Sequence, residues 1–60
     1  GVVEQKAGSA VALGSGAVYS SNPKLAAAAQ GEIHLKQSGV CEAFHILPCG
    51  HVQYYRVLIR

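Results

Sequence analysis

The stretch Asn22–Gly31, NPKLAAAAQG, carries the strongest local structural signal in this chain. Its asparagine can cap a helix, and Pro23 suits the first helical position because its missing N–H would be unpaired there. Four consecutive alanines follow, and alanine has the highest helix propensity of all residues. Gly31 can then adopt the left-handed backbone conformation that commonly ends a helix. The stretch therefore predicts one short helix.

The end of this helix is open to two interpretations. The segment Glu32–Gln37 alternates apolar and polar residues, which is typical of a half-buried strand. Alternatively, the helix continues beyond Gly31, with Leu25, Ala29 and Ile33 as its apolar stripe. A glycine inside a helix costs about 1 kcal/mol relative to alanine. The local pattern therefore favours a helix followed by a strand.

Further strands are predicted on both sides of the helix. The apolar segments Ala10–Leu13 and Ala17–Ser20 are separated by Gly14-Ser15-Gly16, which predicts a hairpin. Val2–Ala7 is a weak first strand or a loose tail. We expect an α+β fold in which one helix packs on a small antiparallel sheet of four or five strands. We expect the core to contain Leu13, Val18, Leu25, Ile33, Leu35, Phe44, Ile46, Val57 and Ile59.

The C-terminal third predicts an antiparallel hairpin. Val40–Leu47 and His51–Arg60 are rich in strand-forming residues, and Pro48-Cys49-Gly50 between them is a turn signal. Alternation divides the last strand into two faces. One face carries Tyr55, Val57 and Ile59, and the other carries Tyr54, Arg56, Leu58 and Arg60.

Length and composition limit the possible functions. Sixty residues form one domain, residues 1–60, with a marginal core that often needs a disulfide, a metal or a partner. No apolar run is long enough for a transmembrane helix, and no signal-peptide pattern opens the chain. The net charge of +2 is too small to indicate nucleic-acid binding by itself.

The two cysteines, Cys41 and Cys49, favour one disulfide across the predicted C-terminal hairpin. A disulfide implies an oxidising compartment, so we expect a secreted, extracellular protein. A short closed loop of this kind stabilises a fold by about 2–3 kcal/mol. Two free thiols, or pairing with another chain, are the alternatives.

Cys41, His45, Cys49 and His51 form the densest cluster of metal-ligating residue types. Two thiolates and two imidazoles are a ligand set that zinc accepts, although the spacing matches no standard zinc finger. The segment Leu47–Val52, LPCGHV, is similar to the centre of a RING finger. This resemblance implies an alternative function, a small zinc-binding interaction module. We expect no other cofactor.

Catalytic chemistry is poorly supported by the residue types present. The chain has no aspartate, so only its three glutamates could orient a histidine or form an acid–base pair. An active ribonuclease would need His45 and Glu42 as that pair. No complete catalytic constellation is present, so we expect no catalytic residues.

Aromatic and basic groups are combined on the last predicted strand. Tyr54, Arg56 and Arg60 share one face. Tyrosine can stack on a nucleic-acid base and arginine can pair with a phosphate, so these three residues are the candidate binding residues.

Several segments together resemble a known family. Gly14–Ser21, GSGAVYSS, precedes the alanine run, Phe44-His45 follows it, and Tyr54-Tyr55-Arg56 comes later. In order and spacing they are similar to the small secreted fungal guanyl-specific ribonucleases and to the inactive effectors built on that fold. The resemblance implies a hairpin, one alanine-rich helix and a sheet. Arg56 stands where the family's Tyr-Tyr-Glu motif has its catalytic base, so the resemblance implies a protein that does not cleave RNA.

These observations lead to one main functional hypothesis. We expect a small secreted, non-enzymatic binding protein, effector- or toxin-like, on a reduced ribonuclease-like scaffold. Its expected partner is a host protein or RNA.

Overall fold

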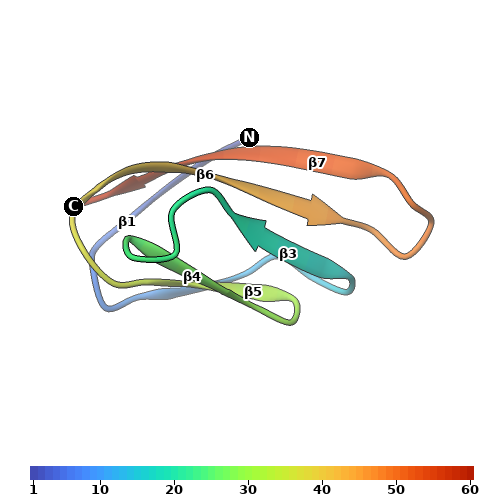
Figure 1. Cartoon of the computed structure of the whole chain (residues 1–60), viewed down its shortest axis with the longest axis horizontal. Helices are drawn as coiled ribbons and strands as arrows, with labels where there is room; N and C mark the ends of the chain where they lie inside the picture. Colours follow the sequence, from blue (N-terminus) through green and yellow to red (C-terminus); the bar gives the residue numbers. More distant parts are fainter.

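The computed structural model describes residues 1–60 and contains seven strands and no helix (Figure 1). No segment of the chain therefore forms a helix that could cross a membrane. The predicted α+β class is wrong, and the helix implied by the ribonuclease resemblance is absent with it. The strands are β1 (Val2–Gln5), β2 (Ala10–Ala12), β3 (Ala17–Ser20), β4 (Ala26–Ala29), β5 (Glu32–Leu35), β6 (Gly39–Ile46) and β7 (Val52–Ile59).

The strands form two sheets. The four-stranded sheet has the order β1-β7-β6-β3, and the three-stranded sheet has the order β2-β5-β4. All neighbouring strands are antiparallel except β1 and β7, which are parallel. In Figure 1 the four-stranded sheet lies above the three-stranded sheet, and the two inner faces enclose the core.

The N-terminal part of the predicted helix forms one turn and then becomes a strand. The carbonyl of Asn22 accepts hydrogen bonds from the N–H groups of Leu25 and Ala26, both at 3.0 Å. The side-chain oxygen of Asn22 accepts from the N–H of Lys24 at 3.2 Å, as a capping residue does. From Ala26 onward the chain is extended as β4. The capping residues therefore form a single turn that leads into β4, and no helix follows.

The alanines are extended because pairing and burial outweigh their helix propensity. A helix shorter than about 12–15 residues is marginal in water, and this run offers only four alanines. As β4 the run pairs along its whole length with β5, and Ala26 becomes fully buried. Gln30 and Gly31 link the two strands, with Gly31 at a φ of +76°. Gly31 thus turns a hairpin instead of ending a helix.

The hairpin predicted around Gly14-Ser15-Gly16 is also wrong. β2 pairs with β5 and β3 pairs with β6, so the glycine-rich segment crosses from one sheet to the other. The carbonyl of Gly31 accepts from the N–H groups of Leu13 and Gly14, at 2.8 and 3.2 Å. Gly16 has a φ of +117°, and a Cβ atom there would lie 2.0 Å from the carbonyl oxygen of Ile46. Only glycine fits at this crossing.

The remaining strand predictions are confirmed. β6 and β7 form the expected antiparallel hairpin, and β5 occupies the predicted alternating segment. Ile33 and Leu35 are buried on β5, and Val57 and Ile59 are buried on β7. The face of β7 that carries Tyr54 and the arginines is the exposed one, as predicted.

The core contains smaller side chains than the sequence predicts. Five of the nine predicted residues are buried, and Leu13 and Leu25 pack at the edge of the core. Phe44 and Ile46 lie on the opposite face of β6, where Phe44 is exposed. Small residues fill the space between the sheets instead. The buried cluster is Val18, Ala26, Ile33, Leu35, Cys41, Ala43, Val57 and Ile59.

Candidate functional site

The side of the four-stranded sheet that faces away from the three-stranded sheet carries the exposed apolar side chains. We call this side the outer face. Side chains alternate between the two sides of the sheet along each strand. Residues that lie directly opposite one another in neighbouring strands share a side, so the register shows which residues of β1, β3, β6 and β7 lie on the outer face. All exposed large apolar side chains of the protein lie on it: Val2, Tyr19, Val40, Phe44, Val52 and Tyr54. The outer face is therefore the main candidate site.

An aromatic row crosses the outer face. Tyr19 on β3 is directly opposite Phe44 on β6, which is directly opposite Tyr54 on β7. The rings of Phe44 and Tyr54 have centroids 5.7 Å apart and planes inclined by 59°. Tilted aromatic pairs at this distance attract each other, and cross-strand pairs stabilise a sheet. The three side chains are nevertheless 56%, 37% and 44% exposed, so each keeps a substantial part of its surface available to a partner.

A polar pair lies beside the aromatic row. Glu42 on β6 is opposite Arg56 on β7. The hydroxyl of Tyr54 donates a hydrogen bond to Oε2 of Glu42 at 2.5 Å. This hydrogen bond, followed by burial and by the negative charge of Glu42, raises the pKa of Tyr54 above its usual value, while Arg56 acts in the opposite direction. The hydroxyl therefore stays protonated, and the bond fixes the orientation of the ring.

The three residues predicted as a binding group are only partly brought together. Tyr54 and Arg56 are neighbours on the outer face, and both are exposed. Arg60 is six residues from Tyr54, which corresponds to about 20 Å along a strand. Nε of Arg60 lies 3.9 Å from a carboxylate oxygen of Glu4, and both side chains are exposed. Arg60 therefore belongs to the far end of the sheet.

The two cysteines are free, and the hairpin does not bring them together. Cys41 is buried within β6, whereas Cys49 is exposed in the turn between β6 and β7. The five residue steps from Cys41 to the end of β6 span about 17 Å, and a disulfide requires Cα atoms within about 7 Å. Burial, followed by the nearby charge of Glu42, raises the pKa of the Cys41 thiol.

The residues predicted as zinc ligands do not converge either. No three histidine, cysteine or acidic side chains gather anywhere in the structure in a way that could hold a metal ion. Cys41 and His45 point into the core from β6, whereas Cys49 and His51 are exposed near the turn. The four side chains are therefore split between the core and the surface.

His45 is buried in the protein interior, where it makes a hydrogen bond to the backbone. It is 1% exposed, and its Nε2 donates to the carbonyl of Ser15 at 2.7 Å. Its Nδ1 has no hydrogen-bond partner. Glu42 is three residues from His45 on the same strand, and because this spacing is odd, Glu42 points to the opposite face of the sheet. His45 and Glu42 therefore do not form the acid–base pair that an active ribonuclease would need.

The sequence pattern predicts neither Tyr19 nor Phe44 as an outer-face residue. It indicates no role for Tyr19, and it predicts Phe44 in the core. The signal for Phe44 was present in the alternation of β6, where it shares a face with Val40 and Glu42. For Tyr19 no local signal existed, because its position depends on the pairing of β3 with β6.

No family of known proteins, no curated protein and no solved structure matches this chain.

Proposed function

We propose that this chain is a non-enzymatic binding protein whose outer face binds a partner protein. The observation that supports this proposal is the concentration of all exposed large apolar side chains on one side of one sheet. Scattered apolar side chains are normal on a protein surface, whereas a contiguous apolar patch with a polar border marks an interaction site. Aromatic residues and arginine are also enriched at protein interfaces.

The charges on the outer face favour a protein partner over RNA. The carboxylate of Glu42 lies within the patch and is held there by the hydroxyl of Tyr54. A phosphate backbone stacked along the aromatic row would face this negative charge. Arg60, the second basic residue, already lies near Glu4. An apolar protein surface carries no such run of negative charge, so it complements the face better.

The experiment compares two double variants. Phe44→Thr with Tyr54→Thr removes two members of the aromatic row, and threonine preserves strand propensity. The matched control is His34→Thr with Lys36→Thr, which changes two polar residues exposed on and beside β5. Wild type and both variants are immobilised at equal density and exposed to the same cell extract. Bound proteins are quantified by mass spectrometry, and the affinity of a purified captured protein is then measured.

The proposal expects the outer-face variant to lose a protein that the wild type and the control retain. Removing two interface aromatic residues lowers affinity by about 10-fold or more. Equal capture by all three proteins would overturn the proposal. A labelled single-stranded RNA is tested in parallel, and RNA binding that is lost only in the outer-face variant would reassign the face to nucleic acid.

A further inference from the structure

The outer face matches itself across the line that runs between its two central strands, β6 and β7. We call this line, which is parallel to the strands, the midline. Each outer-face residue of β6 lies directly opposite one residue of β7 across the midline. Three of these pairs are apolar or aromatic, and the fourth joins a carboxylate to a guanidinium. The pairs are Val40–Leu58, Glu42–Arg56, Phe44–Tyr54 and Ile46–Val52.

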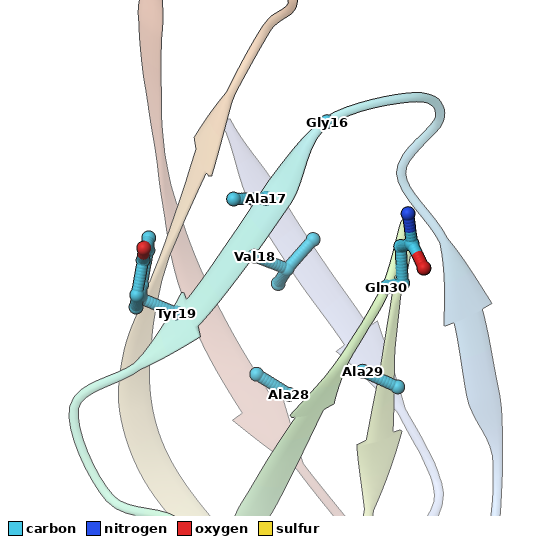
Figure 2. A pocket seen from close by; sticks show the side chains of 7 residues that line it. All are labelled: Gly16, Ala17, Val18, Tyr19, Ala28, Ala29 and Gln30. Carbon is cyan, nitrogen blue, oxygen red and sulfur yellow. The ribbon is translucent and has the colours of Figure 1, made fainter.

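The two edge strands extend this apolar surface, because Val2 on β1 and Tyr19 on β3 are exposed on the same face. Figure 2 shows the division of side chains along β3, beside a cavity of about 410 Å³ between β3 and β4. Ala17 and Tyr19 point to one side of β3, and Val18 points to the other side, where Ala28 of β4 lies. The outer face is therefore continuous across all four strands.

A half-turn about an axis above the midline, parallel to it, places the outer face of one copy on the outer face of a second copy. Each residue of β6 then lies over its own cross-strand partner on β7 of the other copy. Arg56 meets Glu42 of the second copy, and Phe44 meets Tyr54 of the second copy. An axis across the strands would instead place Arg56 against an arginine or an uncharged residue. Of these two symmetric arrangements, only the axis along the midline pairs both charges.

Arg56 and Glu42 are able to make this contact between copies. Neither ion pair of the protein includes Arg56. The hydroxyl of Tyr54 donates to Oε2 of Glu42, and Oε1 accepts no hydrogen bond within the chain. A carboxylate has enough lone pairs to accept from an arginine while it keeps the bond to Tyr54. Both charges therefore have partners in the interface, where an unpaired charge would be costly.

Charge and size also suit a second copy. The charged side chains of the four strands are Glu4, Glu42 and Arg56, and Arg60 lies beside Glu4. Their charges sum to zero, so the chain's net charge of +2 comes from residues outside this set. Two copies therefore repel each other least through the outer face. The molecule measures 32 × 16 × 15 Å, so two such faces bury about 1,000 Å² together, near the lower limit for a specific interface.

We propose that the outer face binds a second copy of this chain in a symmetric dimer whose two-fold axis follows the midline. This inference rests on the proposed function, because it names the partner of the same face. The two sheets pack face to face with their strands nearly aligned, as sheets in sandwiches do. The small interface makes the dimer weak, with a dissociation constant in the micromolar range or above. A 60-residue domain with a small core gains buried apolar surface in this way.

Sedimentation equilibrium from micromolar to millimolar concentration tests the dimer. The average mass of the wild type should rise with concentration toward twice the chain mass of 6.3 kDa. In Glu42→Arg, Arg56 meets an arginine of the second copy, and in Arg56→Glu, Glu42 meets a glutamate. Each variant alone should dimerise at least about 10-fold more weakly than the wild type, because like charges then face each other in both contacts.

An equimolar mixture of the two variants is the decisive sample. One chain then carries two positive charges at these positions and the other carries two negative charges, so both contacts become attractive. The mixture should recover the dimer that each variant loses. The matched controls are Glu32→Arg and Lys36→Glu, which make the same charge changes on and beside β5, and they should dimerise like the wild type. Circular dichroism checks that every variant is folded.

A wild type that stays monomeric at millimolar concentration overturns the inference. So does a dimer that the two charge reversals leave unchanged, or a mixture that recovers no dimer from two folded variants. If a variant does not fold, isotope-filtered NMR on mixed labelled and unlabelled wild type decides alone. Contacts between the rings of Phe44 and Tyr54 of different chains are expected, and their absence in the dimer overturns the inference.

Failure of this inference is distinguishable from failure of the proposed function. A monomeric wild type that still captures an extract protein through Phe44 and Tyr54 keeps the proposed function and replaces the second copy by that protein. A monomer that captures nothing through this face removes both. A dimer that is lost in the Phe44→Thr with Tyr54→Thr variant supports both.

Discussion

The β6–β7 hairpin and the β4–β5 hairpin differ in length and in side-chain size. β6 and β7 each contribute eight residues, whereas β4 and β5 each contribute four. The longer hairpin carries large cross-strand neighbours such as Phe44 and Tyr54, which contact each other directly. The shorter hairpin pairs four alanines with the residues of β5. Its alanine side chains have little surface with which to stabilise the pairing.

The two hairpins are therefore held in place by different interactions. Pairs of large side chains stabilise β6–β7 locally. β4 instead depends on its packing against the other sheet, where Ala26 is fully buried. Ile33, on β5 between β2 and β4, is also fully buried. The short hairpin should therefore be more sensitive to changes in the core than to changes on its surface.

The largest effect is expected from Ile33→Ala. This variant removes a buried side chain from the central strand of the three-stranded sheet, which costs about 2–5 kcal/mol. A 60-residue domain has little stability to lose, so this change should unfold a large fraction of the protein. Urea unfolding followed by circular dichroism measures the loss. Val40→Ala on the exposed face of β6 is the control, and a loss there as large as in Ile33→Ala would contradict the comparison.

A smaller effect is expected at the turns of the two hairpins. Gly31 and Gly50 have φ angles of +76° and +94°, and alanine in this region costs about 1–2 kcal/mol. At Gly31 a Cβ atom would also lie 2.8 Å from the carbonyl oxygen of Gly14, whereas at Gly50 nothing lies within 4 Å. Thermal unfolding should therefore show a greater loss for Gly31→Ala than for Gly50→Ala. Equal losses would mean that Gly14 moves freely and does not hold the short hairpin.

The sequence predicted the strands whose faces differ clearly in polarity. Glu32–Leu35 and Val52–Ile59 alternate in this way, and both were located correctly. The alanine run has no such alternation, so propensity alone favoured a helix. Its strand conformation comes from pairing with β5 and from burial under the other sheet, and neither is visible in the local sequence. The crossing at Gly14–Gly16 was missed for the same reason.

The candidate site was predicted only in part. Tyr54 and Arg56 were assigned to an exposed face because β7 alternates with buried Val57 and Ile59. Both faces of β6 carry apolar residues, so residue size suggested that Phe44 was the buried one. In the structure the sheets are close enough that Ala43 is the fully buried residue there, and Phe44 is outside. The sequence does not specify this distance between the sheets.

The cysteines provide a third test, with an effect on reactivity rather than on folding. Cys49 is exposed and should react quickly with Ellman's reagent in the native protein. Cys41 is buried, and burial raises the pKa of its thiol, so little reactive thiolate is present near pH 8. We expect one fast thiol per chain and a second that reacts only in denaturant. Two protected thiols that appear only after reduction would show a disulfide and would require a different β6–β7 hairpin.

The smallest effect is expected at the hydrogen bond between Tyr54 and Glu42 on the outer face. The hydrogen bond to Glu42 is the main reason that the pKa of Tyr54 is raised above its usual value of 10.0. Glu42→Gln removes the negative charge, so the pKa of Tyr54 should fall, and the positive charge of Arg56 should lower it further. NMR titration of the tyrosine ring carbons measures this change, with Glu4→Gln as the control.

The sign of the pH dependence follows from the same contact. A raised pKa in the folded protein stabilises it below pH 10.0, and this contribution is lost as the pH rises further. Because Tyr54 is exposed, the loss should be small beside that in Ile33→Ala. An unchanged pKa in Glu42→Gln would show that the hydroxyl and the carboxylate do not remain in contact in solution. The aromatic row would then be free to reorient, and the longer hairpin would depend on its aromatic pair and backbone ladder alone.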